Sequence, residues 1–122
     1  MTPQRRPGQA LAETALCMPV LLALLLGIVD IGWLYNHQLM LTHAAREGAR
    51  QGTLGQSGDQ IRAAVKSTLQ ASGFSPVPTD SQIVVDMTGG KAKVTINADV
   101  PCLFATSGPL VKLRAATEMR LD

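Results

Sequence analysis

The sequence has few aromatic residues: one Trp, one Tyr and two Phe among 122 residues. Single-stranded nucleic acid is bound largely by stacking on aromatic side chains, and this chain offers little for that purpose. Excess charge is also scarce, because eleven Lys and Arg against nine Asp and Glu leave a net charge of +2. Arg5 and Arg6 account for that surplus, so no basic stripe remains to hold a phosphate backbone. Nucleic acid is therefore not an expected partner.

Cysteine is scarce as well, and two cysteines exclude a disulfide-stapled miniprotein. A length of 122 residues excludes a multidomain enzyme. His37 and His43 are six residues apart, so on a helix they point in different directions and cannot share a metal. His43 and Glu47 are four residues apart, but they supply only two ligands with no third nearby. The sequence therefore predicts no metal, no cofactor and no catalytic site.

One long apolar segment dominates the N-terminal part of the chain. Residues 14–29, TALCMPVLLALLLGIV, are sixteen residues without a charge. Counted from Gln9 the segment is 21 residues long, or about 31 Å as a helix, which is enough to cross a bilayer core of about 30 Å. Because Arg5 and Arg6 precede it, the positive-inside rule places the N-terminus in the cytoplasm and the chain beyond Asp30 on the other side.

Three interpretations of this segment compete. A secretory signal peptide is disfavoured, because the apolar stretch is long and no small-x-small cleavage site follows it. A plain single-span anchor is the simplest interpretation. The third is a prepilin-like signal, cut on the cytoplasmic side so that the apolar stretch is retained. For this, Gly8 ends a short basic leader, MTPQRRPG, and Glu13 is the fifth residue counted from Gln9.

Glu13 is a charge inside the apolar segment, where charges are costly. Cleavage between Gly8 and Gln9 would create a free amine at the head of the helix. The Glu13 of a neighbouring subunit could pair with that amine, which would compensate both charges if the geometry is good. Alternatively, Glu13 lies at the level of the lipid headgroups, where its charge costs little.

Helical periodicity continues beyond the apolar segment and predicts one helix over residues 9–52, with a possible kink at Pro19. Apolar and small residues form one face of its second half: Ile31, Leu34, Leu41, Ala45, Gly48 and Gly52. The small side chains at Ala45, Gly48, Ala49 and Gly52 would let another backbone approach closely. Since glycine weakens a helix by about 1 kcal/mol relative to alanine, we expect a tight contact there, with the protein's own sheet or with a neighbouring subunit.

The remainder, residues 53–122, predicts a small α+β module. Breaker residues at 52–58, GTLGQSG, end the first helix, and a second amphipathic helix is expected over residues 59–71. Alternating patterns predict three antiparallel strands over residues 82–88, 91–100 and 112–121, the first two joined by a Gly89–Gly90 turn. The apolar face of such a sheet must be covered, and the amphipathic helices are available to cover it. The predicted division of the chain is therefore a leader over residues 1–8, a long helix over residues 9–52 and this module over residues 53–122.

The N-terminal residues RPGQALAETALCMPVLLALLLGIVDIGWLYNHQLMLTHAAREGAR resemble TadE-like proteins, the pseudopilins or minor pilins of Tad (tight adherence, Flp or type IVc) pilus systems. The block at residues 44–50, AAREGAR, is the most specific part of the resemblance. The matching single positions are Gly8, Glu13, Pro19, Arg46, Glu47 and Arg50.

The resemblance implies a pilin-like structural protein rather than an enzyme. It implies cleavage by a prepilin peptidase and a role in pilus assembly, adhesion or secretion. The expected partners are inner-membrane lipid, that peptidase, other pilins or pseudopilins and membrane platform proteins. The protein would cross the bacterial inner membrane once, with a periplasmic module that could also enter the extracellular pilus. The alternatives are an unprocessed single-span periplasmic scaffold or binding protein and, less favoured, an anchored periplasmic enzyme.

Overall fold

A computed structural model describes residues 7–104 and 110–121 of the chain. Most of the predicted leader, including Arg5 and Arg6, therefore lies outside the described residues, as does part of the connection between the last two strands. The elements follow in the order α1 (Pro7–Thr53), α2 (Gly58–Ala71), the short 3-10 helix η1 (Asp80–Gln82), β1 (Ile83–Asp86), β2 (Lys91–Val100) and β3 (Val111–Arg120). The predicted α+β fold class is confirmed.

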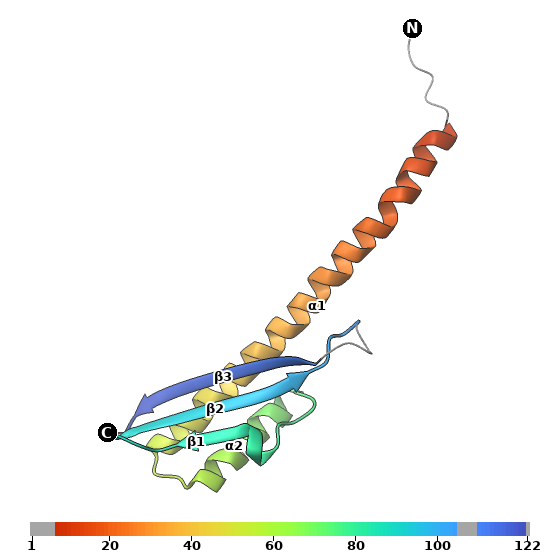
Figure 1. Ribbon diagram of the computed structural model, residues 1–122. Coiled ribbons are helices and arrows are strands. Elements are labelled where there is room, and N and C mark those ends of the chain that lie inside the picture. Colours follow the sequence, from red (N-terminus) through yellow and green to blue (C-terminus); the bar gives the residue numbers. More distant parts are fainter. Residues whose placement is uncertain (1–6, 105–109, 122) are drawn as a thin grey trace.

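Helix α1 is the longest element. Its C-terminal half packs against the module, and its N-terminal half extends away from it (Figure 1). Its 47 residues correspond to about 70 Å. The helix is continuous through Pro19, the only proline in its interior. It begins at Pro7, two residues before the predicted start, and proline suits a first helical turn because the missing N–H has no intrahelical partner there.

Helix α2 begins with a capping box. Ser57 Oγ accepts a hydrogen bond from the backbone N–H of Gln60 (3.4 Å), and Gln60 Oε1 accepts one from the backbone N–H of Ser57 (3.0 Å). Two orphan donors of the helix start are thereby satisfied. The apolar stripe of α2 is buried at Ile61, Val65 and Leu69. It packs against α1 and completes a helical layer.

The three strands form an antiparallel meander in the order β1-β2-β3. Gly89 and Gly90 have φ angles of +64° and +70°, and the Lys91 N–H donates to the Thr88 carbonyl oxygen (3.2 Å). Two successive positive φ values are the requirement of a type I′ hairpin turn, which only glycine meets without strain. The predicted Gly-Gly hairpin is confirmed.

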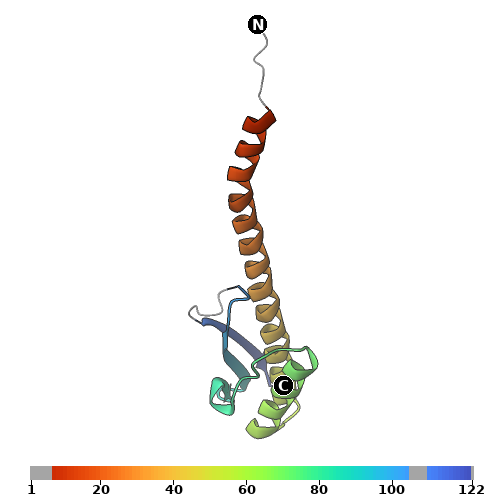
Figure 2. The same ribbon diagram turned by 90° about the vertical axis from the view of Figure 1, so that its right-hand side faces the viewer.

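Both helices lie on the same face of the sheet (Figures 1 and 2). The inward positions predicted for β2 are confirmed, because Ala92, Val94, Ile96, Ala98 and Val100 are buried, but Thr95 on the other side of the strand is buried as well. Between α1 and β3, the Gln38 Nε2 amide donates a hydrogen bond to the Arg114 carbonyl oxygen (2.9 Å) and joins the strand to the helix. No helix of the described residues covers the other face of the sheet, as expected for an antiparallel sheet covered on one side.

Three sequence expectations need correction. β1 is shorter than predicted, because Gln82 ends η1 with its N–H bonded to the Thr79 carbonyl oxygen (3.0 Å) and Thr88 belongs to the turn. β3 runs one residue earlier than predicted, from Val111 to Arg120. Ile31 does not share the packed face of α1, since its side chain is 70% exposed.

Candidate functional site

The predicted cleavage and assembly residues lie in the first two turns of α1. Gly8 and Gln9 are exposed, and a Cβ added at Gly8 would meet no atom within 4 Å. The Gln9 Nε2 amide donates to Glu13 Oε1 over 3.4 Å, a long hydrogen bond at a fully exposed position. Such a contact is weak, so the Glu13 carboxylate remains free to accept a stronger donor.

The N-terminal half of α1 has an apolar surface on every side. Every side chain from Pro7 to Val29 is exposed. The most apolar 18-residue stretch has a mean hydropathy of 2.3, and none of it is buried. Because an apolar helix of this length is stable when lipid or other helices surround it, α1 is compatible with a single-pass membrane anchor.

The end of the apolar segment is joined to the module by one polar contact. The Asp30 carboxylate is half-buried, and its Oδ1 accepts a hydrogen bond from the backbone N–H of Leu103 (2.8 Å). Leu103 belongs to the connection between β2 and β3, 73 residues away in sequence. Sequence reasoning identified Asp30 only as the outer boundary of the span, because nothing in a sequence reports a contact with a distant loop.

His37 is buried, with 3% of its surface exposed. Its Nδ1 lies 2.9 Å from the Trp33 carbonyl oxygen, and because a carbonyl oxygen only accepts, the proton is on Nδ1. Its ring lies 4.5 Å from the Trp33 ring and 5.2 Å from the Phe74 ring, measured between centroids. Two of the four aromatic side chains of the sequence, Trp33 and Phe74, thus pack around the His37 ring where α1 enters the module. In the sequence, only the i, i+4 spacing of Trp33 and His37 indicates that these two side chains are neighbours on the helix.

The small residues of α1 contact the protein's own core. A Cβ added at Gly48 would lie 2.6 Å from Val65 Cγ2 of α2, and one at Gly52 would lie 2.8 Å from Ala92 Cβ of β2. Both distances are shorter than real Cβ contacts, so the two glycines permit α1 to approach α2 and the sheet closely. Ala45 and Ala49 are fully buried in the same face.

The charged residues of the AAREGAR block do not converge on a site. Glu47 and Arg50 form a two-pronged ion pair, with Arg50 Nε 3.1 Å from Glu47 Oε2 and Arg50 Nη2 2.9 Å from Glu47 Oε1. The Gln51 amide also donates to Glu47 Oε1 (2.8 Å). The hydrogen bond from Arg50, with that from Gln51, holds the pKa of Glu47 below its usual value, and the same pair raises the pKa of Arg50. Arg46 and His43 are exposed.

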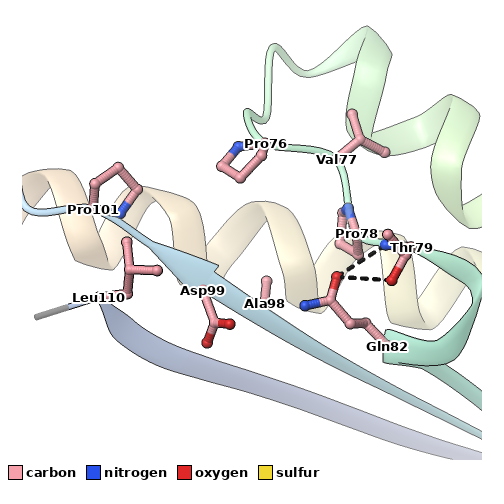
Figure 3. A pocket seen from close by; sticks show the side chains of 9 residues that line it. All are labelled: Pro76, Val77, Pro78, Thr79, Gln82, Ala98, Asp99, Pro101 and Leu110. Carbon is pink, nitrogen blue, oxygen red and sulfur yellow. Dashed lines mark hydrogen bonds between the residues drawn. The ribbon is translucent and has the colours of Figure 1, made fainter.

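A shallow apolar pocket of about 400 Å³ lies between the α2–β1 connection and the end of β2 (Figure 3). The lining residues are Pro76, Val77, Pro78, Thr79, Gln82, Ala98, Asp99, Pro101 and Leu110. Gln82 Oε1 is already engaged, since it accepts from the Thr79 N–H (2.9 Å) and the Thr79 hydroxyl (3.3 Å). Asp99 is the one titratable side chain in that lining. Within residues 7–104 and 110–121, no three His, Cys, Asp or Glu residues gather as a metal site would need.

The arrangement defines a class of protein: a small α+β module carried on a long helix whose free half is apolar. The family model of TadE-like proteins matches residues 8–50 of the chain, a segment that lies entirely within α1. The resemblance noted in the sequence is thereby confirmed for this segment, and the chain carries a TadE-like N-terminal region. No curated protein and no solved structure matches the chain.

Proposed function

We propose that this protein is a structural component, a minor pilin or pseudopilin, of a Tad-type pilus system. The observation that carries the proposal is the coincidence of the TadE-like segment with α1. Over its first half this helix offers apolar surface all round, and over its second half it forms the core of the module. A helix of this kind can span a bilayer before assembly and can pack with similar helices in a filament.

The proposal includes processing between Gly8 and Gln9 by a prepilin peptidase. The exposure of both residues and the open space around Gly8 support access by such an enzyme. Cleavage would place a new amine at Gln9, one helical turn before Glu13. The weak contact that Glu13 makes within its own chain leaves its carboxylate available to the amine of a neighbouring subunit.

The proposed location is the bacterial inner membrane, with a single span, a cytoplasmic N-terminus and a periplasmic module that can enter the extracellular pilus. The partners would be inner-membrane lipid, the prepilin peptidase, other pilins or pseudopilins and the membrane platform of the pilus machine. In this role the protein would contribute to pilus biogenesis, and through it to adhesion or secretion, as a scaffold without a cofactor.

N-terminal sequencing of the protein extracted from membranes tests the processing step. A chain starting at Gln9 supports the pilin interpretation, and Gly8→Leu should then yield a membrane-inserted protein that keeps the leader. Gly27→Leu is the matched control, because Gly27 also lies in open space but far from the cleavage position. A parent chain starting at Met1 or Thr2 would instead support an unprocessed, membrane-anchored scaffold.

Glu13→Gln tests the assembly step, because it keeps the size and hydrogen bonding of the side chain and removes its charge. Membrane insertion should be equal or better, since a neutral amide is less costly in lipid than a carboxylate. If Glu13 pairs with the amine of a neighbour, surface pili should be lost while cleavage and the membrane level of the protein persist. Normal pili at a normal protein level would contradict the pairing.

A further inference from the structure

Three large apolar side chains are exposed on the module in the connection between β2 and β3. Leu103, Phe104 and Leu110 are 40%, 51% and 57% exposed. β2 ends and β3 begins at the end of the sheet that lies toward the N-terminal half of α1 (Figures 1 and 2). Exposed apolar side chains that gather in one place mark a surface that something covers.

The Asp30 contact fixes the depth of this connection along α1. The Leu103 N–H is held 2.8 Å from Asp30 Oδ1, and Asp30 is the first charge after the uncharged residues 14–29. The connection therefore meets the helix where the apolar span ends. If α1 crosses a bilayer, a segment held at that level lies against the bilayer surface.

The residues of α1 at the same level are those of a membrane interface. Trp33 and Tyr35 follow Asp30 by less than two helical turns and are 38% and 65% exposed. Trp and Tyr are enriched at membrane interfaces, because an apolar ring and a polar tip both find suitable surroundings there. Exposed side chains suited to a membrane interface, Trp33 and Tyr35 on α1 and Leu103 beside Asp30, therefore occur near the level where the apolar span ends.

We propose that the described ends of the β2–β3 connection dock on the lipid bilayer, with Leu103, Phe104 and Leu110 at the boundary between headgroups and acyl chains. This inference rests on the proposed membrane insertion of α1. Lipid is favoured over a protein partner because the Asp30–Leu103 contact holds this part of the module beside the end of the apolar span. A second point of contact restricts the tilt of the module on the membrane, which a single helix alone leaves free. Asp30 is a positioning residue for this contact.

The test places a single tryptophan in the connection of the full chain, reconstituted in vesicles of phosphatidylethanolamine and phosphatidylglycerol. Phe104→Trp in a Trp33→Phe background supplies it, since Trp33 is the only native tryptophan. Phospholipids with brominated acyl chains quench tryptophan that reaches the acyl boundary. We expect emission to fall by about twofold or more, as for side chains buried 5–10 Å into the interface. Leu54→Trp in the same background is the control, because Leu54 is 63% exposed at the opposite end of the module and should stay unquenched.

Two further reporters make the outcomes distinct. Leu110→Trp replaces Phe104→Trp if the latter does not fold, and quenching of either supports the proposal. Leu22→Trp, within the span, reports insertion of α1, and if it is unquenched both the membrane anchor and the docking are wrong. A quenched Leu22→Trp with unquenched reporters at positions 104 and 110 overturns the docking alone. A blue shift at position 104 that grows with protein density, without quenching by bromine, would show that a second copy covers the surface and would also overturn it.

Discussion

The two halves of α1 share one continuous helix but have opposite surroundings. From Pro7 to Val29 every side chain is exposed. From His37 to Gly52 seven residues are buried, and five of them are alanine or glycine. The leucine-rich half is therefore the one without contacts to the module, and the half rich in small residues forms the core (Figure 1).

This difference shows that side-chain size, more than hydrophobicity, separates the two roles of the helix. A helix that packs between a second helix and a sheet must approach both closely, and small residues allow this. A helix that faces lipid or other apolar helices gains most from large apolar side chains. Hydropathy alone would have placed the core in the wrong half.

Matched leucine substitutions test this comparison with the largest expected effect. Leu41 is fully buried and Leu24 is 60% exposed on the same helix. Leu41→Ala should lower the free energy of unfolding of the module by about 2–5 kcal/mol, because it leaves a cavity in the core. Leu24→Ala should leave that free energy unchanged within error. Urea unfolding of the full chain in detergent micelles, followed by Trp33 fluorescence, measures both, and equal losses would show that the two halves do not differ.

Matched glycine substitutions should give the next largest effect. Gly48→Leu forces a side chain into the space occupied by Val65 and should cost about 1–3 kcal/mol or more of stability. Gly27→Leu enters open space, so the melting temperature of the module should not fall. Thermal unfolding by circular dichroism in the same micelles checks the pair. A stable Gly48→Leu protein would mean that α1 can move away from α2 at little cost.

Asp30 lies between the two halves, and changing it should have a smaller, local effect. Asp30→Ala removes the acceptor of the Leu103 N–H, so we expect the Leu103 amide to exchange with solvent roughly tenfold faster, as for the loss of about 1–1.5 kcal/mol. Asp30→Asn keeps an acceptor oxygen and should retain most of the protection. Amide hydrogen exchange read by NMR distinguishes the two variants. Equal exchange in the parent and Asp30→Ala would show that the contact does not hold the connection.

The smallest effect is expected from the exposed ion pair of the packed half. Because the pKa of Glu47 is lowered in the folded state by Arg50, its ionised form stabilises the protein above the pKa of an unfolded glutamate. That contribution is lost as pH falls through the folded pKa. Glu47→Gln should therefore melt slightly below the parent near pH 7, by less than about 2 °C, since exposed ion pairs contribute little. The difference should shrink as pH falls through the folded pKa of Glu47, and a difference that grows in acid would contradict this sign.

Much of the fold could be predicted because its signals are local. The two-residue period of β2, the Gly89–Gly90 turn and the breaker residues after Gly52 each depend on neighbours in sequence. The ends of β1 and the face containing Ile31 were wrong for a different reason. The start of β1 is set by the η1 turn that precedes it, and the packed face of α1 begins only near Leu34, where the helix first meets the module. The periodicity of the sequence does not report either limit.

The predicted site residues divide in the same way. Gly8, Glu13 and the AAREGAR block are recognisable from spacing and from resemblance, and the family match lies on the segment that contains them. The partner of Asp30 and the burial of His37 against Phe74 could not be predicted, since each joins residues from separate elements.

By itself the sequence determined the helix, its apolar free half, the hairpin and the TadE-like segment, because periodicity, turn chemistry and motif spacing are properties of contiguous residues. Only the tertiary structure decided what the small residues of α1 contact and where the β2–β3 connection lies. Gly48 could have faced a neighbouring subunit, but it faces Val65, and Leu103 reaches Asp30 across 73 residues of chain. The physical reason is that such contacts depend on how separate elements pack against one another, and the closeness of that packing follows from all of their side chains together.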